Sequence, residues 1–281
     1  MNDLPLAAPA ADALSPFELV DPQGDPGFLV ICDHAANALP RGYGTLGLPV
    51  AEFARHIAWD IGAAGVARHL ARLLGAPAVL ARFSRLLVDL NRGEDDPTIV
   101  MKLSDGAVVP GNRDIDPFRD AGEFAHRLAR FHAPYHAAIA TALGRAKAAG
   151  VVPLILSVHS FTPAWRGRAR PWHTGILWDR DDRLAAPLLA ALRAEPGLVV
   201  GDNAPYTGRL KNDCLYRHGT ARGLPHALIE IRQDLIGSDA GQIEWAERYA
   251  RLLRGLADAP GLREIRHFGS HTGPVVPISG G

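Results

Sequence analysis

The sequence predicts a single α/β domain with a mixed, mainly parallel sheet and helices on both faces. Short apolar runs bounded by turn residues alternate with segments of helical periodicity, and no internal repeat breaks that order. The 281 residues suit one large domain, and 47% hydrophobic residues suffice for a sizeable core. We expect the domain at 16–266, between a flexible leader at 1–15 and a flexible tail at 267–281.

The elements follow from this pattern in order. Apolar runs predict strands, and the spacing of Phe53, Ile57 and Ile61 predicts the first helix. The predicted strands are 28–32, 78–81, 85–90, 154–158, 175–178, 198–200 and 227–231. The predicted helices are 50–74, 117–149, 182–194 and 240–256, with a long loop rich in Gly, Asp and Pro at 93–116.

Charge and composition exclude several classes of protein. Lys+Arg and Asp+Glu are both 30, which argues against a broad nucleic-acid or membrane surface. No apolar run reaches the roughly 18 residues that span a bilayer. Two cysteines are too few for a disulfide framework, so we expect a reducing, cytoplasmic setting.

Three polar pairs follow apolar strands: Asp33-His34, Asn91-Arg92 and His159-Ser160. In open α/β sheets ligands bind outside the carboxyl ends of the strands. The three pairs are therefore predicted to meet at one edge of the sheet and to form a small-molecule site there.

His34 and His159 are candidate ligands of a catalytic zinc ion, which uses three protein ligands and a water. The alternative is that each is an ordinary hydrogen-bonded loop histidine. Asp60, between apolar Trp59 and Ile61, is the preferred oxygen ligand, although an i,i+4 pair with His56 would also explain it. Asn37 is the second choice, since an amide is a weaker zinc ligand than a carboxylate.

Glu230 lies inside the apolar segment Ala227-Leu-Ile-Glu-Ile231. Such a carboxylate is either paired to a cation such as Arg232 or works as a general base, because burial would raise its pKa into the useful range. Arg92, supported by Asn91, suits bidentate binding of a substrate carboxylate. Arg85 and Arg222 are further candidates for an anion pocket.

Other patterns have less support. His132 and His136 are i,i+4 on a helix, but no acidic partner accompanies them, so a surface or packing role is expected. The serines lack a Gly-x-Ser-x-Gly context, and the dinucleotide and P-loop glycine patterns are absent from the sequence.

Four segments together resemble the N-formylglutamate amidohydrolase family, in the family's order. They begin at Ile31 (ICDHAANALP), Ser84 (SRLLVDLNR), Ser157 (SVHSFTP) and Leu228 (LIEIRQD). The family looks like a distant relative of the zinc carboxypeptidases and aspartoacylases, which implies their mainly parallel fold. It also implies hydrolysis of N-formyl-L-glutamate to formate and glutamate, at the end of histidine breakdown.

Carried over position by position, the resemblance implies that His34 and His159 bind the metal and that Asn91-Arg92 grips a substrate carboxylate. It implies that Glu230 activates water. The carboxypeptidase relatives have Glu three residues after the first histidine, where this chain has Asn37, so the third ligand stays open between Asp60 and Asn37. The Cys-Asp-His start of the first motif leaves room for another N-acyl amino acid as substrate.

Three hypotheses therefore remain. The first is a metal-dependent amidohydrolase of N-formyl-L-glutamate, the second a deacylase or peptidase acting on another N-acyl amino acid. The third is a binding module that holds a small anion without catalysis. Metal analysis and a panel of N-formyl, N-acetyl and peptide substrates separate them.

Overall fold

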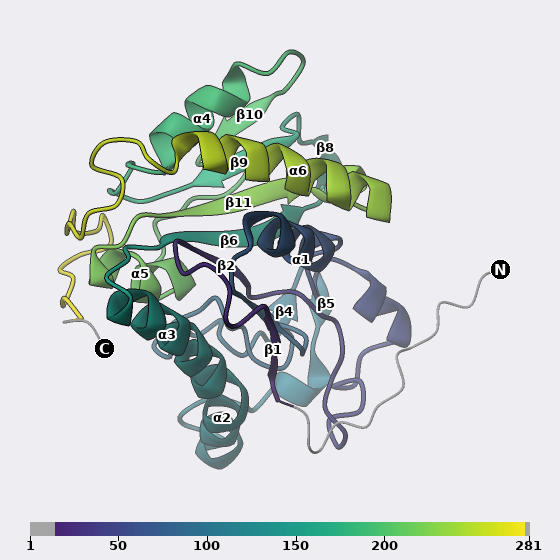
Figure 1. Cartoon of the computed structure of the whole chain (residues 1–281). Helices are drawn as coiled ribbons and strands as arrows, with labels where there is room; N and C mark the ends of the chain where they lie inside the picture. Colours follow the sequence, from purple (N-terminus) through teal and green to yellow (C-terminus); the bar gives the residue numbers. More distant parts are fainter. Residues whose placement is uncertain (1–14, 279–281) are drawn as a thin grey trace.

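The computed structural model describes residues 15–278 and contains a seven-stranded sheet of mixed direction (Figure 1). Its strand order is β1-β3-β2-β6-β11-β9-β10. Neighbours run parallel except in the pairs β1–β3 and β9–β11. The strands are β1 (Phe17–Val20), β2 (Phe28–Cys32), β3 (Ala78–Ala81), β6 (Leu154–Phe161), β9 (Thr174–Leu177), β10 (Val200–Asp202) and β11 (His226–Arg232). The predicted mixed, mainly parallel sheet is confirmed.

The helices form two groups. In Figure 1, α1 (Ala63–Leu74), α4 (Ala185–Arg193) and α6 (Asp239–Leu256) lie side by side, and α6 contacts both α1 and α4. The second group is α3 (Ala133–Ala148) and α5 (Cys214–His218), which contact each other. α2 (Ala121–Arg127) and the π-helical turn η3 (Leu128–His132) lead into α3.

The remaining elements are short. They are β4 (Leu103–Ser104), β5 (Ala107–Val108), β7 (Ala164–Trp165), β8 (Arg168–Ala169) and the 3-10 turns η1 (Val50–Ala54), η2 (Pro110–Asn112), η4 (Thr220–Arg222) and η5 (Gln233–Leu235).

The order of the strands explains where a ligand can bind. From β2 the chain crosses through α1 to β3 on one side, and then through α3 to β6 on the other side of β2. Because parallel crossovers are right-handed, these opposite steps put α1 and α3 on opposite faces of the sheet. The carboxyl ends of β2 and β6 therefore border the crevice at a topological switch point.

The central strands are buried on both faces, which is why they read as unbroken apolar runs. Every residue of β2, β3 and β6 is buried, including polar Ser157, His159 and Ser160 near the end of β6. Parallel strands covered by helices on both faces have this composition. Polar side chains in such strands need partners, and they find them at the site described below.

Two predicted elements are wrong. The expected helix 50–74 is split into η1 and α1, because Gly62 adopts φ 83° and begins a new helix. The expected strand 85–90 is a turn: the Ser84 hydroxyl accepts from the Leu86 amide, and the Ser84 carbonyl accepts from the Leu87 amide. The loop 93–116 contains the small hairpin β4–β5.

The termini are only partly described. Residues 1–14 of the expected leader and 279–281 of the expected tail lie outside the described residues. Within the tail, the Ile278 amide donates to the Ala221 carbonyl, and the flexibility of 267–281 stays a prediction. Across residues 15–278, no helix combines the length and the apolar character needed to cross a membrane.

Candidate active site and metal centre

His34, Asp60 and His159 meet at the crevice between β2 and β6. One ligand atom from each of the three buried side chains lies within 4.8 Å of the others. His34 follows β2, His159 lies in β6, and Asp60 precedes α1. The Asp60 amide donates to the His34 carbonyl at 2.9 Å, which fixes the irregular segment against the end of β2.

Each histidine is oriented by a second buried carboxylate. His34 Nε2 lies 2.7 Å from Asp89 Oδ1, and His159 Nε2 lies 3.2 Å from Asp33 Oδ2. A carboxylate only accepts hydrogen bonds, so the Nε2 atoms carry the donating protons. The Nδ1 atoms of His34 and His159 then face Asp60 Oδ2, at 3.4 and 2.8 Å.

This arrangement requires positive charge between the two rings and Asp60. Burial by itself raises the pKa of Asp60, but the charge of His34 and the His159 hydrogen bond outweigh it and lower that pKa well below its usual range. Burial likewise lowers the pKa of His159, but its bonds to Asp33 and Asp60 raise it to about 10. Either a proton on the histidines or a bound divalent ion can supply the positive charge that balances the Asp60 carboxylate.

The donor set fits a metal ion. Two imidazole Nδ1 atoms and one carboxylate oxygen are three ligands of the kind found in catalytic zinc sites. Among residues 15–278, His34 Nδ1 and Asp60 Oδ1 are buried without a hydrogen-bond partner. Carboxylates that hold the distal nitrogen of a ligating histidine, as Asp33 and Asp89 do here, commonly support such sites.

Both supporting carboxylates are themselves held in place. Asp33 accepts from the Tyr135 hydroxyl at 2.7 Å and from the Ser157 hydroxyl at 3.2 Å. Asp89 accepts two hydrogen bonds from the Arg85 guanidinium, at 2.7 and 3.1 Å. The ring orientations of the two histidines are therefore fixed from both sides.

Glu230 lies beside this cluster because of strand register. On β11 it pairs with His159 of β6 and, on its other side, with Gly175 of β9. Burial raises the pKa of Glu230 to about 8, and within the described residues its Oε2 has no hydrogen-bond partner. Arg232 pairs with Asp234 instead, so the ion pair considered for Glu230 does not form.

A cavity of about 350 Å³ opens onto these groups. Arg85, Asn91 and Arg92 line it together with the three clustered residues and Glu230. The Asn91 Oδ1 atom accepts from the Cys214 amide, and Arg92 bonds the Asn91 carbonyl. The guanidinium of Arg85 is engaged by Asp89, while that of Arg92 is partly exposed at the cavity.

Two predicted residues lie elsewhere. The Asn37 side chain donates to the Phe53 carbonyl at 2.8 Å and is not part of the cavity wall, so among the described residues Asp60, not Asn37, joins the histidines. Arg222 lines a different hollow, with His136 and His218. It is not among the residues that line the cavity near Glu230.

Several site residues were missed by the sequence analysis. Asp89 stands between apolar Val88 and Leu90, the same signal that singled out Asp60. Asp33 was predicted at this edge of the sheet but given no role, and it reaches His159 on the next strand. His56, Tyr206 and Asp213 also line the cavity, and no periodic pattern marks the loop that carries the last two.

The chain is similar to proteins of known family and structure. The sequence model of N-formylglutamate amidohydrolase matches residues 27–237. A gene product of Agrobacterium tumefaciens has a crystal structure that is similar at 35% identity and a TM-score of 0.81, covering 86% of this chain and 94% of the other. The N-formylglutamate amidohydrolase of Ralstonia eutropha JMP134 has the same fold, at 22% identity and a TM-score of 0.57, over 86% of this chain and 99% of that one. None of the curated proteins matches the chain.

Proposed function

The chain belongs to the N-formylglutamate amidohydrolase family, hydrolases of amide C–N bonds, and from this premise we propose that it hydrolyses a small N-acyl amino acid with the help of a divalent metal ion. N-formyl-L-glutamate is the proposed substrate, with formate and L-glutamate as products. Family membership removes the non-enzymatic hypothesis from consideration.

The observation that carries the proposal is the meeting of Glu230 with the His34–Asp60–His159 cluster in one cavity. We assign the metal, in the first instance zinc, to His34 Nδ1, His159 Nδ1 and an Asp60 oxygen. Bound there, the ion would lower the pKa of water and polarise the amide carbonyl. Proton transfer and substrate binding are assigned to side chains of the protein.

Glu230 is the proposed general base. Its Oε2 would take the proton of the attacking water and later deliver it to the leaving nitrogen of glutamate. The pKa of about 8 applies to the chain without an ion, and a nearby cation would lower it by charge attraction. The group would then be ionised at neutral pH and still basic enough to accept a proton.

Arg92 is proposed to bind a carboxylate of the substrate, with Asn91 beside it. Both line the cavity. Among the described residues, the Arg92 guanidinium hydrogen-bonds only the Asn91 carbonyl and approaches Asp96 at 3.7 Å. Holding that carboxylate aligns the amide with Glu230 and the metal ligands. The cavity of about 350 Å³ suits a compact acid rather than a folded protein.

Glu230→Gln tests the base directly. The substitution keeps the size of the side chain but removes its ability to accept a proton, so kcat should fall by about 10²–10⁴-fold while bound metal stays unchanged. Steady-state kinetics of formate release and metal analysis of the same preparation measure both. Glu244→Gln, an exposed change on α6, is the control. Normal turnover in Glu230→Gln would remove this residue from the base role.

Substrate identity needs a separate test. Arg92→Gln should raise KM for N-formyl-L-glutamate at least about tenfold and change kcat less, because it removes a charged hydrogen-bond donor used for binding. A panel of N-formyl, N-acetyl and peptide substrates with the parent enzyme then compares kcat/KM values. A higher kcat/KM for a substrate with another acyl group would rule out N-formyl-L-glutamate as the main substrate. The proposal that the chain is an amidohydrolase would still stand.

The proposed setting is the cytoplasm, in the breakdown of histidine. Cys32 and Cys214 are both buried free thiols, as suits a reducing compartment. Equal numbers of acidic and basic residues fit a protein that binds a small anion rather than nucleic acid.

A further inference from the structure

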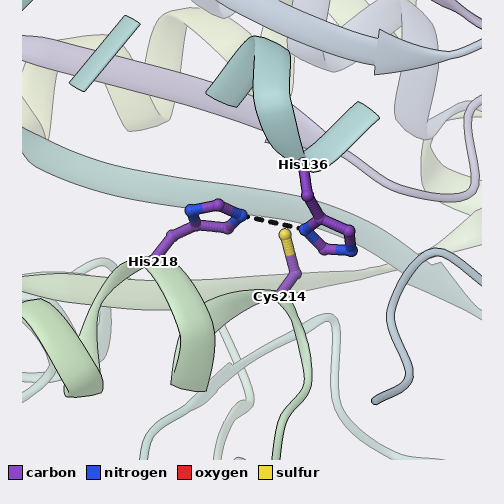
Figure 2. Close-up of side chains that lie close together, drawn as sticks. All are labelled: His136, Cys214 and His218. Atoms are coloured by element: carbon purple, nitrogen blue, oxygen red, sulfur yellow. Dashed lines mark hydrogen bonds between the residues drawn. The ribbon is translucent and has the colours of Figure 1, made fainter. Parts of the chain in front are cut away.

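A second group of metal-binding side chains lies between α3 and α5. It adjoins the proposed active site, because the Cys214 thiol bonds Asp33, the carboxylate that holds His159. One ligand atom each from His136, Cys214 and His218 lies within 4.8 Å of the others, and all three residues are buried (Figure 2). Cys214 and His218 are i,i+4 on α5 and therefore share one face of that helix. His136 approaches from α3, with its Nδ1 2.9 Å from His218 Nε2.

We propose that His136, Cys214 and His218 form a second site, which binds a borderline-soft divalent ion such as zinc. Two imidazoles and a thiolate are a donor set that selects zinc over magnesium or calcium. Around one tetrahedral zinc ion such atoms stand roughly 3.3–3.7 Å apart. The present 2.9 Å between His136 and His218 needs to widen by only a few tenths of an ångström.

A histidine that binds an ion through one ring nitrogen carries its proton on the other. With an ion on His136 Nδ1, the ring proton would sit on Nε2, and the Leu90 carbonyl accepts a hydrogen bond from this ring. His218 Nδ1 has no partner within residues 15–278, so it can carry the ring proton once Nε2 binds an ion. Burial also lowers the pKa of His136 and His218, which keeps both imidazoles neutral.

Cys214 must lose its proton when the ion binds. Burial, followed by the charge of Asp33, raises its pKa well above the usual value, so the thiol is protonated in the metal-free chain. On binding, the S–H bond breaks, the sulfur–metal bond forms and the proton leaves to solvent. Ion binding to thiols commonly releases protons in this way, and affinity should therefore fall at low pH.

An ion can reach this group from outside. His136 and His218 line a surface hollow of about 890 Å³, which also includes Lys211 and Arg217. The fourth coordination position would face this hollow, where water or a small anion completes the shell. An ion held by His136 of α3 and by Cys214 and His218 of α5 would tie the two helices together.

Cobalt(II) titration of the metal-free, reduced protein tests the site. Cobalt bound to a thiolate gives an intense near-ultraviolet charge-transfer band, which carboxylate and imidazole ligands do not give. The parent protein should show this band and bind two ions per chain. Cys214→Ser should lose the band and one ion, whereas Cys32→Ser, the matched buried cysteine, should keep both.

The two sites can be judged separately. Asp60→Asn should lose the ion of the proposed active site but keep the full thiolate band, and this result does not depend on catalysis. His218→Gln replaces Cys214→Ser as the test variant if the serine protein fails to fold. A folded parent protein without the band, or a band that survives in Cys214→Ser, overturns the second site and leaves the proposed function untouched.

Discussion

At the scale of single residues, the site is decided by which ring nitrogen each histidine offers. Asp89 and Asp33 occupy the Nε2 atoms of His34 and His159, so the Nδ1 atoms turn to Asp60. A buried histidine without such a partner would populate both tautomers and more than one ring orientation. The carboxylates therefore contribute to ion affinity without touching the ion.

Asp89→Asn should weaken metal binding about 10–100-fold, because an amide is a poorer acceptor for the His34 Nε2 proton and no longer balances Arg85. Competition with a chromophoric chelator gives the dissociation constant. Asp95→Asn, an exposed carboxylate in the same segment, should leave it unchanged. Equal affinity of a folded Asp89→Asn protein and the parent would show that Asp89 does not support the metal.

At the scale of elements, the break before α1 places Asp60. Gly62 has φ 83°, and a Cβ at this position would lie 2.2 Å from the Ile236 carbonyl oxygen. The turn therefore depends on glycine for two reasons, its backbone conformation and the close approach of a second segment. Gly75, at the other end of α1, has φ 63° but open space around it.

Gly62→Ala and Gly75→Ala separate these two reasons. Gly75→Ala should lower the free energy of unfolding by about 1 kcal/mol, the cost of a left-handed alanine. Gly62→Ala should lower it by about 3 kcal/mol, because the clash with Ile236 adds to that cost. Urea unfolding of both variants measures the difference. Equal decreases in the free energy of unfolding would mean that the backbone near Ile236 moves aside at no measurable cost.

The sequence was informative where a single local signal decides the structure. Segments such as 28–32 and 154–158 are apolar runs, and the polar residues that follow them could be placed at one edge of the sheet. The segment 85–90 also looks like a strand, but Ser84 closes a turn and Asp89 is held by Arg85 and His34. The contact between Asp89 and His34 joins residues 55 positions apart, and a contact of that kind has no signature in a local pattern.

At the scale of the whole molecule, many ionisable groups are buried, and their pKa shifts have opposite signs. Burial lowers the pKa of five histidines: His56, His132, His136, His218 and His226. Burial raises the pKa of Glu230 to about 8 and that of Asp213 to about 7. Protons therefore bind differently to the folded and unfolded chain over the whole range from weakly acidic to weakly basic pH.

These signs predict an acid-sensitive fold in the metal-free protein. Below about pH 6.5 the unfolded chain protonates all five histidines, whereas the folded chain does not, so stability is lost as pH falls. Glu230, Asp213 and His159 act in the opposite direction, because folding raises the pKa of each, but they are three groups against five. Stability should therefore fall between about pH 6.5 and about pH 5.

Urea unfolding with chelator present, at about pH 6.5 and about pH 5, measures this loss. His226 contacts neither metal cluster: its ring bonds the Leu224 carbonyl and Thr220. His226→Gln should reduce the loss by roughly 1 kcal/mol per pH unit, because glutamine takes up no proton in either state. His173→Gln serves as the comparison, since that ring is only partly buried and accepts from the Val199 amide. A free energy of unfolding that rises steadily toward pH 5 would contradict the prediction. It would show that the five histidines also take up protons in the folded chain.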